Sequence, residues 1–345
     1  MNSNILIIGG GIIGLATAFR LAGAGAQVTI IERNTCGAES SWAGGGILSP
    51  LMPWQYAPEV NILCNASIAR YADWIAEIRS LSDADPEYWT SGMQVLSPFD
   101  NTDAQAWCAA NNWRYELDDD VLWLPDVAQV RNPRLIKSLR AAALARGVQL
   151  LEHTETIAFD IAHERVQGVT TTQGKLVADT VITCAGAWSQ GVLAAVPPSK
   201  TIKPMRGQML LFKAPAGTLP TVIYQQGLYL IPRLDGHILV GSTVEDVGFD
   251  KTTDMNTRNK LAEAALTILP ALRQAEFIQH WSGLRPGSPD NIPTIARHPE
   301  IANLYINSGH FRYGVTMAPI SADLITEMIL GQTSSMDMSA YRWRE

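Results

Sequence analysis

The chain has 345 residues, of which 47% are hydrophobic and 17% are charged, and its formal net charge is −7. The length predicts two domains, and the composition allows a sizeable core and excludes a disordered chain. The acidic balance, without a long run of Lys or Arg, argues against a nucleic-acid-binding surface. The four cysteines (Cys36, Cys64, Cys108 and Cys184) are scattered. They form no C-x-x-C pair, so they indicate neither a zinc or other metal site nor a disulfide framework, as expected in a reduced, cytoplasmic compartment.

The first 33 residues carry a dinucleotide-binding pattern. An apolar run at 5–8 predicts a strand, an Ala/Leu-rich stretch predicts a helix, and a second apolar run ends at Glu32. Between strand and helix, Gly9 permits a sharp turn, Gly11 lets the backbone approach a pyrophosphate, and Gly14 lets the helix pack on the sheet. The helix N-terminus faces the phosphates, and Glu32 accepts hydrogen bonds from ribose hydroxyls. The alternative is a glycine turn that only packs.

The apolar N-terminus resembles a signal peptide in hydrophobicity alone. It lacks the basic region that precedes a signal sequence, and the glycine pattern explains its composition. No other apolar run reaches the length of about 18 residues that a membrane-spanning helix needs. We therefore expect neither a signal peptide nor a membrane span.

A second glycine-rich segment follows directly, at residues 40–47, with the sequence Ser-Ser-Trp-Ala-Gly-Gly-Gly-Ile. An enzyme that binds a nicotinamide cofactor has no obvious need for this second segment. A longer flavin dinucleotide does, because a second stretch of backbone must pass close to its phosphates and ring, and small residues permit that approach. The alternative is a flexible surface loop.

The middle of the chain alternates between helical and extended patterns. Asn132 and Pro133 fit the N-cap and first position of a helix that runs to residue 145. Residues 154–180 predict a three-stranded meander. An apolar strand from residue 180 then ends in Ala185-Gly186-Ala187, which either approaches a ligand or forms an ordinary strand-to-helix turn. Further helices are predicted at 59–80 and 101–112, and further strands at 88–98, 121–127 and 148–152.

The segment 201–280 is rich in predicted strands and has no nucleotide-binding signal, so it is our candidate substrate domain. Strands at 222–232 and 237–242 flank a turn at 233–236, which is typical of a hairpin. A helix is predicted at 256–269, and strands at 208–213 and 277–282.

The C-terminal part begins with a predicted loop at 283–297, which contains three prolines. A strand follows at 304–307, and a glycine turn at 309–314 leads into a helix at 318–330. A helix N-terminus is an anion site and would suit the N1/C2=O edge of a flavin. Residues 332–345 are expected to form a loosely ordered tail.

These motifs, in this order, resemble the D-amino acid oxidase family of flavoproteins, and within it the members that oxidise glycine for thiamine biosynthesis. The specific part is Gly-Leu-Arg-Pro-Gly at 283–287 with Gly-His-Phe-Arg at 309–312. The resemblance implies an α/β fold, with a Rossmann-like FAD-binding domain and an interleaved α+β substrate domain that has an antiparallel or mixed sheet. The expected FAD-binding domain comprises residues 1–83, 133–200 and 285–345, and the expected substrate domain comprises 84–132 and 201–284.

The resemblance also implies site residues. Arg285 and Arg312 would bind the substrate carboxylate, although arginines are more often structural ion pairs, and Tyr229 would lie in the pocket or be a sheet aromatic. Val244 would be a pocket residue, but it stands where the family has methionine. The expected contacts of non-covalent FAD are Gly9, Gly11, Ile12, Ile13, Gly14, Glu32, Arg33, Ser40, Ser41, Gly45, Gly46, Ile47, Thr156, Gly186, His310, Phe311, Arg312, Tyr313, Gly314, Val315 and Thr316.

The expected reaction is FAD-dependent oxidative deamination of glycine and small amines by O2. The flavin carries the chemistry, so no protein catalytic residue is predicted, and His310 either lies near the flavin or orients its loop. One alternative is a sarcosine or D-amino acid oxidase or a dehydrogenase. Another is a non-catalytic nucleotide-binding redox sensor. The resemblance also implies a homo-oligomer and a thiazole synthase as a pathway partner.

Overall fold

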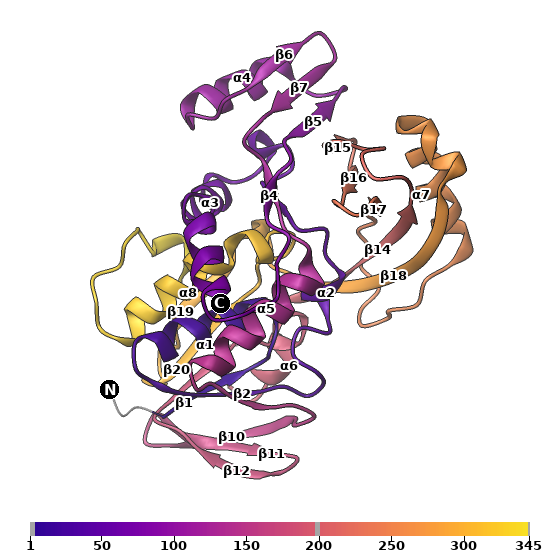
Figure 1. The fold of residues 1–345 in the computed structure, drawn as a ribbon. Coiled ribbons are helices and arrows are strands. Elements are labelled where there is room, and N and C mark those ends of the chain that lie inside the picture. The colour runs from indigo at the N-terminus through magenta and orange to yellow at the C-terminus, as the bar shows by residue number, and fades with distance from the viewer. Residues whose placement is uncertain (1–3, 197–200, 344–345) are drawn as a thin grey trace.

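The computed structural model describes residues 4–196 and 201–343, and two large sheets organise it (Figure 1). The first has six strands in the order β19-β20-β13-β1-β2-β9, and all neighbours are parallel except β19 and β20. We call it the parallel sheet. Its strands are β1 (Asn4–Ile8), β2 (Gln27–Ile31), β9 (Gln149–Leu151), β13 (Thr180–Thr183), β19 (Thr294–Arg297) and β20 (Leu304–Ser308).

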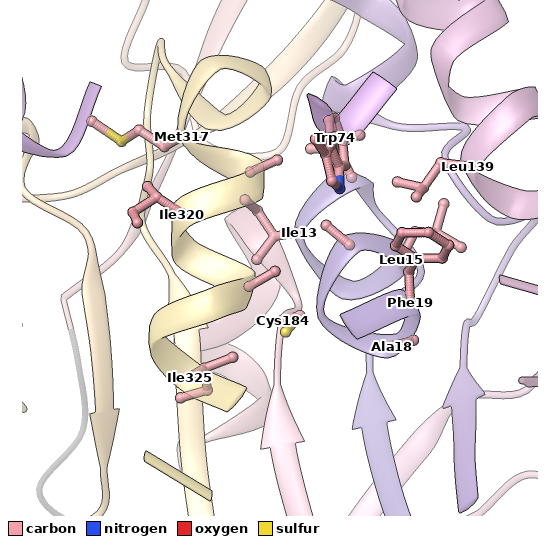
Figure 2. Close-up of a cluster of buried hydrophobic side chains, with 14 of the residues drawn as sticks. Ile13, Leu15, Ala18, Phe19, Trp74, Leu139, Cys184, Met317, Ile320 and Ile325 are labelled. Atoms are coloured by element: carbon pink, nitrogen blue, oxygen red, sulfur yellow. The ribbon is translucent and has the colours of Figure 1, made fainter. Parts of the chain in front are cut away.

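Both faces of the parallel sheet are covered, because side chains alternate along each strand. Ile5 and Ile7 of β1 face a core shared with four helices, whereas Leu6 and Ile8 face the meander on the other side. Figure 2 shows the helical core, with Ile13 between α1 and α8. The helices are α1 (Ile12–Gly23), α3 (Pro58–Arg79), α5 (Asn132–Ala145) and α8 (Gly314–Ile329), and the meander is β10 (Thr156–Ala162), β11 (Arg165–Thr171) and β12 (Gly174–Val177).

The second large sheet has eight strands in the order β18-β14-β17-β16-β15-β5-β7-β6. It is antiparallel except for the parallel pair β15 and β5, so we call it the mixed sheet. Its strands are β5 (Met93–Leu96), β6 (Glu116–Asp118), β7 (Val121–Leu124), β14 (Lys203–Lys213), β15 (Val222–Gln225), β16 (Leu228–Pro232), β17 (His237–Gly241) and β18 (Glu276–Gly287). Helix α7 (Met255–Ile268) covers one face through Leu261 and Ala265, and α4 (Asn101–Ala110) packs through Ala104 and Cys108.

Shorter elements connect the two sheets. A small sheet joins β3, β8 and β4 in that order. It consists of β3 (Ile47–Leu48), β4 (Trp89–Thr90) and β8 (Ala128–Gln129), and the short helices are α2 (Ser40–Ala43) and α6 (Ser189–Val192). The 3-10 helices span Pro53–Gln55, Gly186–Trp188, Pro270–Gln274, Pro289–Asn291 and Ser339–Tyr341. Within residues 4–196 and 201–343, no helix is both long and apolar enough to cross a membrane.

The predicted fold class and the meander are confirmed, and the sheets support our proposed domain division. Every strand of the parallel sheet lies in the ranges 1–83, 133–200 and 285–345. The mixed sheet uses 84–132 and 201–284, although β18 continues to Gly287 across the boundary. Residues 1–3, 197–200 and 344–345 of these ranges lie outside the described residues.

Several local predictions are wrong. The predicted strand 88–98 is two short strands, β4 and β5, which belong to different sheets, and helix α8 begins at Gly314 rather than at residue 318. The predicted loop at 283–297 contains the end of β18 and all of β19, because Gly283 to Gly287 continue the ladder with β14. The predicted strand 222–232 is two strands, since Gln226 and Gly227 have φ of 45° and 89° and form a tight turn. The N-cap of α5 is Arg131, not Asn132. The tail is anchored, because Tyr341 is 1% exposed and its hydroxyl donates to the Glu59 carbonyl at 2.7 Å.

Candidate active site

A cavity of about 400 Å³ lies between the two sheets. It begins at the carboxyl ends of β1 and β2, passes the segment 40–47, and ends against β16, β18 and the start of α8. In open α/β folds, ligands bind at the carboxyl ends of the strands. The cavity is therefore where the sequence pattern places a dinucleotide.

The turn between β1 and α1, and the packing of α1 against it, require glycine at two positions. Gly9 has φ of 107°, and a Cβ there would lie 2.5 Å from the Cys184 carbonyl oxygen. A Cβ on Gly14 would lie 1.9 Å from the Gly9 carbonyl oxygen. The first-turn N–H groups of α1 have no helical acceptor; that of Ile12 donates to Ser41 Oγ at 2.9 Å. This end of the cavity therefore suits phosphate oxygens.

Glu32 lies at the end of β2, where its carboxylate closes the turn. It accepts hydrogen bonds from the backbone N–H groups of Gly10 at 2.8 Å and Asn34 at 2.9 Å. An ionised carboxylate has about four acceptor positions, so capacity for ribose hydroxyls remains. The next residue, Arg33, stacks on Trp188 with its guanidinium carbon 3.7 Å from a ring centroid.

The second glycine segment is held from the mixed sheet. Arg233 is 4% exposed and donates to the Gly45 carbonyl at 2.7 Å. Burial lowers the pKa of Arg233 to about 10. Gly46 has φ of 78°, and a Cβ there would lie 2.1 Å from the Val130 carbonyl oxygen. Asn132 Nδ2 donates to the Ser41 carbonyl at 2.8 Å, which is why this side chain does not cap α5. The segment is therefore a fixed wall rather than a flexible loop.

The start of α8 forms the third wall. Gly309 and Phe311 have φ of 87° and 45°, which turns the chain so that the helix N-terminus faces the cavity. Thr316 Oγ1 donates to the Ile47 carbonyl at 3.2 Å and ties this helix to the second glycine segment. His310 Nε2 bonds to Ser321 Oγ at 3.0 Å, so its side chain orients the loop.

His310 should make the protein less stable in acid. It is 1% exposed, and burial lowers its pKa to about 3, against about 6.5 in an unfolded chain. The unfolded state therefore binds more protons between these values, and the free energy of unfolding falls as the pH falls through this range. We expect His310→Asn to lose part of this slope in denaturant titrations from pH 7 to pH 4. If the free energy of unfolding depends on pH in the same way in both proteins between pH 7 and pH 4, the role of His310 is contradicted. Above pH 7 the two proteins should show the same pH dependence, which is the control.

Two arginines lie together at the far end of the cavity. Arg285, on β18, donates to Ser242 Oγ at 2.7 Å and to the Thr243 carbonyl at 3.1 Å. Burial, the larger effect, and the nearby Arg312 charge lower the pKa of Arg285, whereas Tyr229 raises it. Among residues 4–196 and 201–343, neither guanidinium has a carboxylate within 4.0 Å. Two guanidiniums at one end of the cavity, neither of them paired with a carboxylate of the described residues, are suited to bind a carboxylate ligand.

The cavity brings together most of the predicted site residues. Gly14 does not line it and instead packs α1 on β1; Val244 also does not line it and is 40% exposed. Residues that line the cavity but were not predicted from the sequence include Glu39, Leu51, Asn132, Ser242, Asn307 and Ser308. Of these, only Asn307 and Ser308 could have been recognised from the sequence, because two polar residues at the end of a buried strand are typical of a binding site. Glu39 directly precedes the second glycine segment, whereas Leu51, Asn132 and Ser242 reach the cavity through contacts between distant segments.

The cavity fits a flavin dinucleotide. Helix α1 offers N–H groups for phosphates, Glu32 offers acceptors for a ribose, and the start of α8 offers N–H groups at the opposite end. The glycine segment between them permits a flat ring to lie against backbone. Fold and site together define a flavin-dependent oxidoreductase of the Rossmann type.

The chain belongs to the DAO family, described as FAD dependent oxidoreductase, whose model matches residues 4–328. It is an FAD-dependent amine oxidoreductase. It is 40% identical to glycine oxidase of Pseudomonas putida, over 99% of this chain and 98% of that protein. It is 35% identical to the bifunctional protein ThiO/ThiG of Synechocystis, over 98% of this chain and 53% of that protein.

Solved structures agree with the fold. The crystal structure of glycine oxidase from Geobacillus kaustophilus superposes with a TM-score of 0.92 at 26% identity, covering 100% of this chain and 99% of that one. Iminodiacetate oxidase from Chelativorans gives 0.88 at 26% identity, covering 98% of each chain.

Proposed function

We propose that this protein oxidises glycine and other small amines that carry a carboxylate. The reaction would convert glycine, O2 and H2O into glyoxylate, NH3 and H2O2, by way of an imino acid. The observation that carries the proposal is the pair of guanidiniums, Arg285 and Arg312, at the end of the cavity that faces the N-terminus of α8. The relatives named glycine oxidase support the choice of a small amino acid.

The residues of the chain bind and orient the substrate. Arg285 grips the carboxylate with parallel N–H donors, and Arg312 adds a second charge. Tyr229, which is 7% exposed and bonds to Met209 Sδ, closes the pocket from the mixed sheet and excludes water. FAD, when bound, supplies the hydride acceptor that O2 regenerates. A substrate amine that enters neutral needs no protein base, and His310 is neutral and already bonded to Ser321.

Non-covalent binding of FAD is part of the proposal. The chain has no cysteine after Cys184. Cys184 itself lines the cavity, but burial raises the pKa of its thiol to about 12. A protonated thiol is a poor nucleophile, so the flavin should be released by acid precipitation.

The product has a proposed destination. The relative named ThiO/ThiG joins a chain like this one to a second part. We propose that the unstable imino acid is consumed in thiazole formation for thiamine, by a thiazole synthase. A homo-oligomer, which family resemblance implies, stays a prediction.

An aerobic H2O2 assay with glycine, sarcosine and D-amino acids tests the activity. We expect glycine and small amines to give H2O2 and, without O2, to bleach the yellow protein. Larger turnover with sarcosine or a D-amino acid would move the assignment to that substrate. Bleaching without H2O2 on reoxidation would indicate a dehydrogenase. A flavin that stays oxidised with every amine would overturn the proposal in favour of a redox sensor.

A further inference from the structure

The Arg285 side chain lies over an open space on the neighbouring strand. Strands β14 and β18 pair antiparallel, with Gly207 opposite Gly283 and Met205 opposite Arg285. Gly207 and Arg285 are therefore diagonal neighbours on the same face of the sheet. A Cβ on Gly207 would lie 2.1 Å from Arg285 Nη1 and 2.4 Å from both Cζ and Nη2. The guanidinium thus lies directly over the glycine.

Neutral acceptors hold the guanidinium in this place. The two hydrogen bonds to Ser242 Oγ and the Thr243 carbonyl use two of the five N–H donors of Arg285. Thr243 is itself fixed, because its Oγ1 accepts from the Gln208 backbone N–H at 2.9 Å and donates to Glu245. Glu245 in turn pairs with Arg206. The Thr243 acceptor is therefore anchored to β14, and the two hydrogen bonds leave other N–H donors of Arg285 for a ligand.

We propose that Gly207 and Ser242 are positioning residues that set the Arg285 guanidinium for the substrate carboxylate. Gly207 leaves the space in which the guanidinium lies flat, and Ser242 fixes Nη2. The inference deepens the proposed function and rests on it only for the identity of the carboxylate.

Backbone strain does not explain the glycine. Gly207 is absent from the residues with positive φ, and its ladder hydrogen bonds are those that any residue makes. The three atoms nearest to a Cβ at this position all belong to the end of one flexible side chain, that of Arg285. Alanine can therefore be accommodated if the guanidinium moves, at the expense of ligand geometry rather than of the fold.

The test is Gly207→Ala in the FAD-loaded protein, with acetate as a carboxylate probe that cannot be oxidised. We expect the Kd of acetate, from perturbation of the flavin absorbance, to rise about tenfold, which equals about 1.4 kcal/mol. The KM for glycine should rise by a similar factor with kcat little changed, and FAD content and Tm should match the wild type. An unchanged acetate Kd would overturn the proposal. So would loss of FAD or a lowered Tm, because these would assign Gly207 to packing.

Ser242→Ala should weaken acetate binding in the same direction and provides a second, independent variant. Its matched control is Ser282→Ala, because that hydroxyl lies on β18 near Arg285 but donates to the Lys251 carbonyl at 2.6 Å. The control should bind acetate normally. Equal effects of the two alanine variants would contradict the role of Ser242.

A double-mutant cycle shows whether Gly207 acts through Arg285. Lysine lacks Nη1 and Nη2, so adding Gly207→Ala to Arg285→Lys should change acetate affinity much less than it does in the wild type. Additive effects would overturn the inference. Acetate titration does not require turnover, so it tests the positioning role of Gly207 independently of the proposed oxidation of glycine. If glycine is not oxidised but the cycle shows coupling, the proposed function fails and the positioning role stands.

Discussion

Replacing Arg285 by leucine should raise the KM for glycine and the Kd of acetate about a hundredfold. Arg285 lies in the cavity wall without a carboxylate partner among the described residues, so its charge is available to a ligand. Removing one partner of a hydrogen-bonded charge pair in such a site costs about 3 kcal/mol, which is about a hundredfold in affinity. Steady-state kinetics and acetate titration measure the two constants.

The same variant should be at least as stable as the wild type. Burial lowers the pKa of Arg285, which means that the folded protein disfavours its charged form. Replacing a buried charge that lacks an ionic partner by an apolar side chain is often neutral or stabilising. Thermal unfolding without added carboxylate should show an equal or higher Tm. Arg297→Leu, which removes an exposed charge on β19, is the control and should change neither constant. An acetate Kd for Arg285→Leu equal to that of the wild type would show that the carboxylate binds elsewhere.

The cofactor end of the site could be predicted from local sequence because its chemistry is carried by backbone. Gly9, Gly14 and Glu32 lie within one strand-turn-helix-strand unit, and the turn they form is the one that the spacing predicts. The helix after the glycine turn at 309–314 was predicted from residue 318, whereas it begins four residues earlier, at Gly314.

The substrate end could not be predicted in this way because distant segments build it. Arg285 was identified through a family motif, but its partner Ser242 comes from the end of another strand, and the space it occupies comes from Gly207 on a third. No periodicity relates these positions. Val244, a pocket position proposed from resemblance alone, is not among the residues that line the cavity, and its role stays a prediction. The end of β18 was missed because glycine and proline in 283–287 are typical of a loop, whereas pairing with β14 makes them a strand.

Alanine substitutions at Gly14 and Gly11 should have different effects, because the fold requires glycine at position 14 and cofactor binding requires it at position 11. In Gly14→Ala the new Cβ would lie 1.9 Å from the Gly9 carbonyl oxygen, which is backbone and cannot move aside. Helix α1 must then shift from the sheet, and overpacking of this kind costs about 3 kcal/mol. We expect the FAD-free protein to lose about that much free energy of unfolding, and FAD binding to fail with it.

Gly11→Ala should behave differently. Gly11 has φ of −71°, which any residue adopts, and its Cβ would meet only Ser41 Oγ, at 3.2 Å. The FAD-free variant should therefore stay within about 0.5 kcal/mol of the wild type. The added methyl group would instead occupy the approach to the phosphates, and the Kd of FAD should rise about tenfold or more, which is about 1.4 kcal/mol. Denaturant unfolding of the FAD-free proteins and fluorescence titration with FAD measure the two quantities separately. If both variants lost stability equally, the turn would serve packing alone at both positions, and the phosphates would have to bind elsewhere along the cavity.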